Sequence, residues 1–217
     1  MLKLAFPPAA NGGYRVLAIG AHSDDLEIGC GGTILRLAEA GLIAEARWVV
    51  LSGDGTRAGE ARRAAGVFLA GVPSFAVVVE SFRDGFFPYD GGAVKEVFEG
   101  IKDDFRPDLV FTHRGTDAHQ DHRLVAELTW NTFRDHFVLE YEVPKYDGDL
   151  RAPNVFVELS EEICRRKVEA LIATFESQGD RHWFTDDVFW SLLRLRGLES
   201  HAPSGYAEGF DCRKVTL

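Results

Sequence analysis

The sequence has few of the features that mark disulfide-rich, metal-finger, membrane or secreted proteins. Its 217 residues include only three cysteines, Cys30, Cys164 and Cys212, whose wide spacing gives neither a disulfide framework nor a zinc-finger pair. A reducing, cytoplasmic environment is therefore the simplest expectation. No apolar run reaches the roughly 20 residues that a membrane-spanning helix needs, so we expect no membrane anchor. The first residues also lack the apolar core of a secretory signal.

Positive charge is also scarce, with 24 Lys and Arg against 34 Asp and Glu and a formal net charge of -10. Because a phosphate backbone needs a basic face, we expect no nucleic-acid partner. The glycine cluster "GCGG" lacks the G-x-G-x-x-G spacing of a dinucleotide site. Without a Gly/Ser linker or a repeat, the sequence predicts a single domain over 1–217, with a loose tail over 1–13. It leaves the oligomeric state open, and a homo-oligomer is compatible with it.

Apolar and amphipathic segments alternate along the chain. Runs at 15–21, 45–53, 75–80 and 107–113 predict strands, and segments at 31–42, 57–72, 92–105 and 121–137 predict helices. The strands are apolar throughout, which is typical of parallel strands covered by helices on both faces. Strands at 137–144 and 154–160 and helices at 161–175 and 186–198 would form a C-terminal α/β extension. The predicted fold is a Rossmann-like open, mostly parallel sheet with helices on both faces.

Two polar segments follow the first and fourth predicted strands: "AHSDD" at 21–25 and "HRGTDAHQDH" at 113–122. Because ligands of such sheets bind at the carboxyl ends of the strands, these segments bring histidines and acids to one edge. Imidazole and carboxylate together suit a divalent ion such as Zn²⁺. A dication would also let the adjacent Asp24 and Asp25 both stay ionised. Either segment alone is typical of a solvated turn, and their joint position is much more specific.

Both segments carry a family resemblance. "AHSDDLEIGCGGT" resembles the A-H-P-D-D-E segment of the PIG-L/LmbE-like zinc-dependent N-deacetylases, and "HRGTDAHQDH" resembles that family's H-x-x-x-D-x-H-x-D-H segment. The resemblance extends over about residues 15–211. Ser23 departs from it where the family usually has Pro, and Leu26-Glu27 departs where an acid usually follows the second Asp. The resemblance implies a deacetylase whose substrate is a small N-acetylated amino sugar or sugar conjugate.

The resemblance also implies roles for individual residues. His22, Asp25 and His122 would be the metal ligands, and Asp24 the general base for zinc-activated water. His119 would stabilise the developing oxyanion as an imidazolium held by Asp121 or Asp117. Its spacing of three residues from His122 predicts that both lie on one helix face. The implied substrate-binding positions are Arg57 and Asp84.

Several alternatives stay open at this stage. Fe²⁺ is possible in place of Zn²⁺, since the same ligand types accept both ions. His113 is either a partner of the ligands or a structural hydrogen-bonding residue. The substrate could be a non-sugar N-acyl compound. The chain could also be a non-catalytic, Rossmann-like module that binds a metal or a nucleotide, although such a module has no need for the unliganded Asp24.

Overall fold

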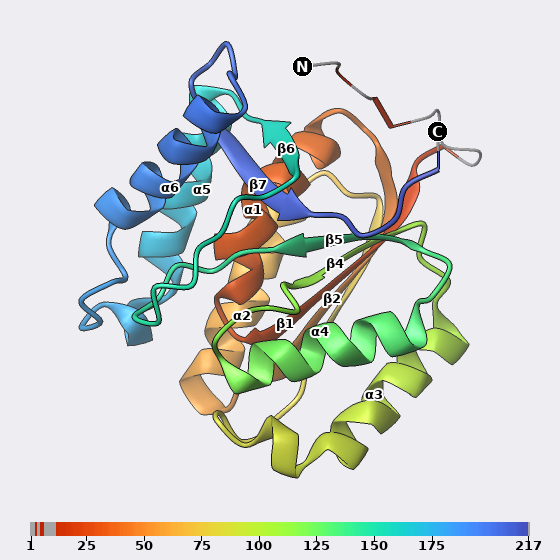
Figure 1. The fold of residues 1–217 in the computed structure, drawn as a ribbon. Helices are drawn as coiled ribbons and strands as arrows, with labels where there is room; N and C mark the ends of the chain where they lie inside the picture. Colours follow the sequence, from red (N-terminus) through yellow and green to blue (C-terminus); the bar gives the residue numbers. More distant parts are fainter. Residues whose placement is uncertain (1–2, 4, 7–11, 217) are drawn as a thin grey trace.

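The computed structural model describes residues 3, 5–6 and 12–216, and the described strands pair into one sheet. The strand order is β3-β2-β1-β4-β5-β7-β6 (Figure 1). Strands β1 to β5 run parallel, whereas β7 is antiparallel to both of its neighbours. The bounds are β1 Tyr14–His22, β2 Ile43–Ser52, β3 Ser74–Val79, β4 Leu109–His113, β5 Phe137–Tyr141, β6 Val155–Glu158 and β7 Ala207–Asp211.

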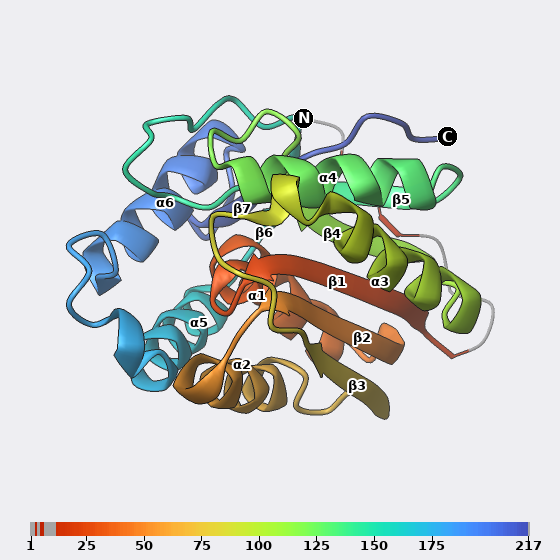
Figure 2. The same cartoon turned by 90° about the horizontal axis from the view of Figure 1, so that it is seen from below.

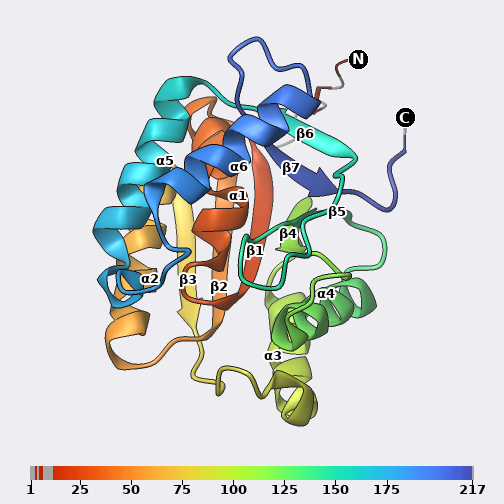
Figure 3. The same ribbon diagram turned by 60° about the vertical axis from the view of Figure 1, so that its left-hand side comes forward.

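Helices cover both faces of this sheet. The helices are α1 Asp25–Glu39, α2 Gly55–Phe68, α3 Gly91–Asp104, α4 Gln120–Thr132, α5 Glu161–Thr174 and α6 Asp186–Glu199, with 3₁₀ turns η1 Phe87–Tyr89 and η2 Glu176–Gln178. Figure 2 shows α3 and α4 on one side of the sheet and α1, α2 and α5 on the other. Figure 3 shows α6 on the same side as α5, over α1 and β7. No helix in the described part of the chain is long and apolar enough to cross a bilayer.

The predicted fold class is confirmed, with one element missed. The mostly parallel sheet and the alternation of strands and helices are as expected. The C-terminal extension joins the same sheet, because β7 inserts antiparallel between β5 and β6. The stretch that forms β7, "AEGFD", was not predicted as a strand. The single domain over 1–217 stays a prediction, and most of the expected tail over 1–13 lies outside the described residues.

Helix α1 begins six residues earlier than the sequence predicts, at Asp25 instead of residue 31. Glycines at 29, 31 and 32 suggested a helix start, but all three lie inside the helix because it is packed too closely for side chains. A Cβ on Gly29 would lie 2.1 Å from Cδ2 of Tyr141. The "AHSDD" segment therefore consists of the last two residues of β1, a two-residue turn, and the first residue of a helix.

Neighbouring strands β1 and β4 bring the two polar segments together. They pair in parallel, and both end in a histidine, His22 and His113. The chain order reverses between them, since β2 and β3 lie to one side of β1 and β5 lies beyond β4. In open α/β sheets this reversal leaves a crevice in which ligands bind.

Candidate metal centre

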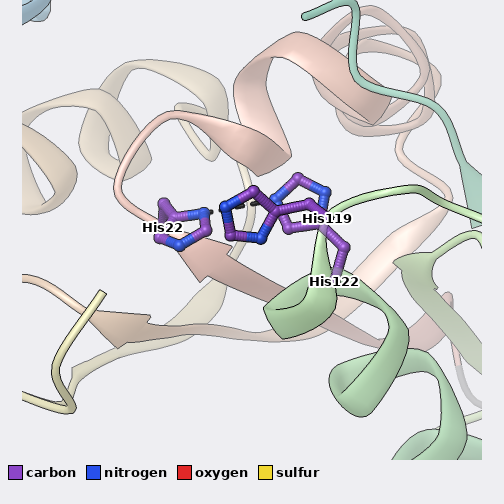
Figure 4. A group of neighbouring side chains, drawn as sticks. All are labelled: His22, His119 and His122. Carbon is purple, nitrogen blue, oxygen red and sulfur yellow. Dashed lines mark hydrogen bonds between the residues drawn. The ribbon is translucent and has the colours of Figure 1, made fainter. Parts of the chain in front are cut away.

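Three donor groups converge from three elements: His22 ends β1, Asp25 begins α1, and His122 lies in the first turn of α4. His22 Nδ1 is 3.2 Å from His122 Nε2 and 3.3 Å from Asp25 Oδ2, and His122 Nε2 is 3.5 Å from Asp25 Oδ1. Figure 4 shows the two rings side by side with His119. Zinc bonds of about 2.0–2.1 Å in a tetrahedron separate ligand atoms by about 3.3 Å, so this donor set fits such an ion.

Charges within this set are already arranged for a cation. Burial disfavours ionisation of Asp25, but the surrounding imidazoles hold its pKa well below the usual value. Burial, followed by repulsion from His113, lowers the pKa of His122 to about 4, so its ring is neutral at pH 7. Burial also opposes protonation of His22, yet the charge of Asp25 and nearby carboxylates raise its pKa well above normal. In the metal-free protein, the protonated ring of His22 therefore supplies a positive charge at the position where a metal ion would bind.

Asp24 is a buried acid beside this set. It occupies the N-cap position of α1 but makes no side-chain capping bond, and its Oδ2 has no hydrogen-bond partner in the described chain. Burial, followed by the charge of Asp25, raises the pKa of Asp24 to about 6. A buried carboxylate without a partner is costly unless a cation lies nearby. This orphaned oxygen is a second observation that fits a divalent ion at the centre.

His113 and Asp117 support the donor residues from behind. His113 Nε2 accepts a hydrogen bond of 3.0 Å from the backbone N–H of Ala21 and lies 3.1 Å from Asp25 Oδ2. Its ring stacks on His122 with centroids 3.8 Å apart. Asp117 Oδ2 is 3.0 Å from His122 Nδ1. Burial opposes ionisation of Asp117, but its hydrogen bond to His122 and nearby positive charges hold its pKa well below normal.

Other donor combinations overlap with this one. Donor atoms also lie within 4.8 Å of one another in the groups His22–His119–His122, His22–Asp84–His119–Asp121 and Asp25–His113–His122. The assignment of ligands to His22, Asp25 and His122 is therefore a proposal that rests on the family motif together with the distances.

The spacing predicted that His119 and His122 lie on one face of a helix. This prediction is wrong, because His119 lies just outside α4. It precedes α4 as the N-cap residue with an extended backbone, and its Nδ1 accepts a hydrogen bond of 3.3 Å from the backbone N–H of Asp121. The rings of His119 and His122 still lie close, with centroids 4.6 Å apart. Because Nδ1 is an acceptor, the ring proton of His119 is on Nε2.

The expected imidazolium of His119 is also not what the structure favours. Burial, followed by the charge of His22, lowers the pKa of His119, which makes the neutral ring the stable form. Asp117 hydrogen-bonds the backbone N–H of His119, at 2.8 Å, and not the ring. Asp121 offers its own backbone N–H to that ring. Its carboxylate points elsewhere.

The carboxylate of Asp121 fixes the loop after β3. Its Oδ2 accepts from the N–H of Gly85 at 2.6 Å and its Oδ1 from the N–H of Phe87 at 3.1 Å. Oδ2 also lies 3.3 Å from His22 Nε2. Asp121 therefore ties the histidine that ends β1 to the loop that carries Asp84.

Arg57 and Asp84 meet at the rim of the centre. Asp84 is half-exposed, with Oδ1 3.1 Å from His22 Nε2 and Oδ2 3.4 Å from Arg57 Nη1. The hydrogen bond to His22 is the main reason that the pKa of Asp84 is below normal. The structure thus brings together all of the sequence-predicted site residues.

Two residues of the site were not predicted, Lys145 and Asp149. Lys145 Nζ lies 3.0 Å from Asp117 and 2.8 Å from Asp149. They belong to residues 142–154, a connection without helix or strand between β5 and β6. A lysine and an aspartate in a loop have no distinctive spacing, so no sequence signal points to them.

Sequence comparison relates the chain to known proteins. Residues 17–133, which include both polar segments, match the family model PIG-L, described as GlcNAc-PI de-N-acetylase. The chain belongs to the PIG-L family. It is also 30% identical over 182 residues to a protein of Escherichia coli K12 named uncharacterized deacetylase YaiS. That alignment covers 79% of this chain and 96% of the relative.

Solved structures resemble the PIG-L-family chain in fold. The N,N'-diacetylchitobiose deacetylase from Pyrococcus horikoshii superposes with a TM-score of 0.71 at 22% identity, covering 91% of this chain and 83% of that one. GalB, the 4-carboxy-2-hydroxymuconate hydratase from Pseudomonas putida KT2440, superposes with a TM-score of 0.69 at 20% identity, covering 94% and 97%. Because one of these proteins is a hydratase, the shared fold does not decide the reaction.

Proposed function

We propose that this protein is a metal-dependent hydrolase that removes the acetyl group from an N-acetylated amino sugar or sugar conjugate. The observation that carries the proposal is the buried, unpartnered carboxylate oxygen of Asp24 beside the converging donors His22, Asp25 and His122 in the described chain. Membership of a de-N-acetylase family and the relative named a deacetylase support an N-acetyl group as the point of attack.

His22, Asp25 and His122 would hold the metal, with Zn²⁺ as the proposed ion and Fe²⁺ as the alternative. When bound, such an ion supplies Lewis acidity that activates water and polarises the acyl oxygen. Only three protein ligands are used, which is the pattern of catalytic zinc sites rather than closed structural ones.

Asp24 is suited to act as the general base. Burial raises the pKa of Asp24 to about 6 in the metal-free protein, and a cation held by the neighbouring donors would favour the ionised form that accepts a proton from attacking water. The same carboxyl group can then return the proton to the departing amine. His119 is the other candidate donor for that step.

His119 is suited to stabilise negative charge on the acyl oxygen. Its Nδ1 is occupied by the helix cap, so Nε2–H is the donor that remains free for a ligand. A neutral imidazole fixed in this way provides a preorganised hydrogen bond for an oxyanion. Asp121 contributes by donating its backbone N–H to the ring of His119 and by holding the Asp84 loop with its carboxylate. Arg57 and Asp84 offer a guanidinium and a carboxylate for sugar hydroxyls.

The proposal is tested by comparing Asp24→Asn with Asp25→Asn. We expect Asp24→Asn to keep bound metal and lose roughly 10²- to 10⁴-fold in rate of amine release, the usual size of a lost general base. Asp25→Asn should lose the metal. The measurements are metal content and mass spectrometry of products from a panel of N-acetyl sugars, their nucleotide conjugates and non-sugar N-acyl compounds.

Each outcome has a definite meaning. Equal metal loss in both variants contradicts the assigned roles. Release only from non-sugar amides replaces the sugar substrate with the alternative hydrolase. Bound metal without amine release from any amide favours a non-catalytic module or an enzyme that adds water to a different kind of bond.

A further inference from the structure

The connection between β5 and β6 packs against the segment that carries His119 and His122. It lies beyond residues 17–133, which match the family model. Within it, Lys145 is only a tenth exposed. Its Nζ lies 3.0 Å from both oxygens of Asp117 and 2.8–2.9 Å from both oxygens of Asp149. This ammonium group is fully occupied by two carboxylates, so it is not free to bind a substrate anion.

Asp117 links Lys145 to the proposed metal centre through hydrogen bonds. One carboxylate oxygen lies 3.0 Å from Nδ1 of His122, and the other accepts from the backbone N–H of His119 at 2.8 Å. An ionised carboxylate only accepts hydrogen bonds, so the proton of His122 is on Nδ1. The lone pair of Nε2 is then directed to His22 and Asp25, as a metal ligand requires.

The connection is anchored on both sides of Lys145. Near its start, Glu142 makes two bonds of 2.6 and 2.7 Å to the guanidinium of Arg196 in α6, and both side chains are buried. Further along, Asp149 Oδ2 accepts a hydrogen bond of 2.6 Å from the backbone N–H of Ala118. Contacts on both sides of Lys145 in the chain therefore hold its ammonium group beside Asp117.

We propose that Lys145 is a positioning residue that, through Asp117, fixes the ring orientation and the protonated nitrogen of His122 and thereby sets the affinity of the centre for a divalent cation. The inference rests on the proposed function, because it takes His122 as a ligand. It gives a role in the metal centre to a residue that lies beyond residues 17–133, the part of the chain that matches the family model.

The test compares Lys145→Met and Lys145→Arg in the full-length chain. We expect Lys145→Met to weaken Zn²⁺ binding by roughly 10- to 100-fold in competition with a chromogenic chelator, the usual effect of losing a partner of a ligand. The visible absorption of bound Co²⁺ should change as well, because it reports ligand geometry. Lys145→Arg should restore most of the affinity and the spectrum. The control is Lys95→Met, which removes a surface lysine bonded to Thr132 in another part of the fold and should change neither.

A folded Lys145→Met protein whose Zn²⁺ affinity is within twofold of wild type overturns the inference. If that variant fails to fold, Asp149→Ala keeps Lys145 but removes the carboxylate that ties it to the backbone of Ala118. It should weaken Zn²⁺ binding in the same direction, and an unchanged affinity and Co²⁺ spectrum overturns the inference. Wild-type protein that binds Zn²⁺ but releases no amine contradicts the deacetylase proposal alone. Wild-type protein that binds no divalent metal overturns the inference itself.

Discussion

We expect the buried ion pair between Lys167 and Glu208 to contribute strongly to the free energy of unfolding, because it holds the helix that carries Asp25. Lys167 Nζ in α5 lies 2.6 Å from Glu208 Oε1 in β7 and donates to the carbonyl of Ile28 at 2.6 Å. The same carboxylate accepts from the N–H of Gly32 at 2.8 Å and from the N–H and hydroxyl of Thr33 at 2.7 and 2.6 Å. One carboxylate thus joins α1, α5 and β7.

Replacing Lys167 with Met keeps most of the length of the side chain and removes its charge. Both partners are only 4% exposed, so the carboxylate of Glu208 would stay buried without its cation. Breaking such a pair costs roughly 3–5 kcal/mol of unfolding free energy. For a chain of this size that corresponds to a fall of roughly 6–20 °C in Tm, at about 2–4 °C per kcal/mol.

Thermal and urea unfolding of three variants measures this effect. Adding Glu208→Gln to Lys167→Met should recover part of the loss, because an amide needs no counter-charge and its one carbonyl oxygen can still accept from the N–H and hydroxyl of Thr33. Lys95→Met, at a partly exposed position, should cost less than about 1 kcal/mol. The reasoning is refuted if Lys167→Met is no more destabilising than Lys95→Met, or if Glu208→Gln makes the Lys167→Met protein less stable still.

Two further predictions concern the centre and its packing. Because the pKa of His22 is raised and its Nδ1 must lose a proton to bind a metal, Zn²⁺ binding should release a proton at pH 7 and weaken as pH falls. Calorimetry in buffers of different ionisation enthalpy counts that proton, and a count of zero contradicts the assignment. Gly29→Ala should lower the unfolding free energy by roughly 1–3 kcal/mol in urea titrations, since its methyl group would overlap the ring of Tyr141. Unchanged stability would show that this contact is not tight.

The order of the elements could be predicted from the sequence because it depends on local apolar patterns. Strands β1, β2, β4 and β5 are short apolar runs that hydrophobic burial explains, whereas β3 is an apolar run at the sheet edge that is exposed to half-buried. The early start of α1 could not be predicted, because Gly29 is ordinarily a poor helix residue. It is accepted here because Tyr141, more than a hundred residues away, occupies the space of a side chain. Strand β7 was missed for a similar reason, since Glu208 looks like a surface residue until Lys167 is placed beside it.

The centre was predicted as a set of residues but not in its hydrogen bonding. Spacing indicated that His119 and His122 lie close, but not that His119 caps α4 through its ring, which requires a specific backbone turn. The contact between Asp117 and Lys145 depends on the course of the loop after β5, and no local sequence pattern predicts that course. Residue identity in the motifs is therefore predictable, whereas proton positions depend on tertiary contacts.

The resemblance to a hydratase as well as to a deacetylase limits what the centre alone can specify. Both reactions add water to a polarised bond, so both can use a cation beside a carboxylate such as Asp24. The distinction must come from groups that contact the rest of the substrate. Arg57 and Asp84 are the charged side chains at the rim that we propose for this role. They bond each other, and Asp84 also bonds His22. If the proposed function holds, a sugar that takes up hydrogen bonds from this pair would loosen the contact of Asp84 with His22, and substrate recognition would then be coupled to the proposed metal ligand that ends β1.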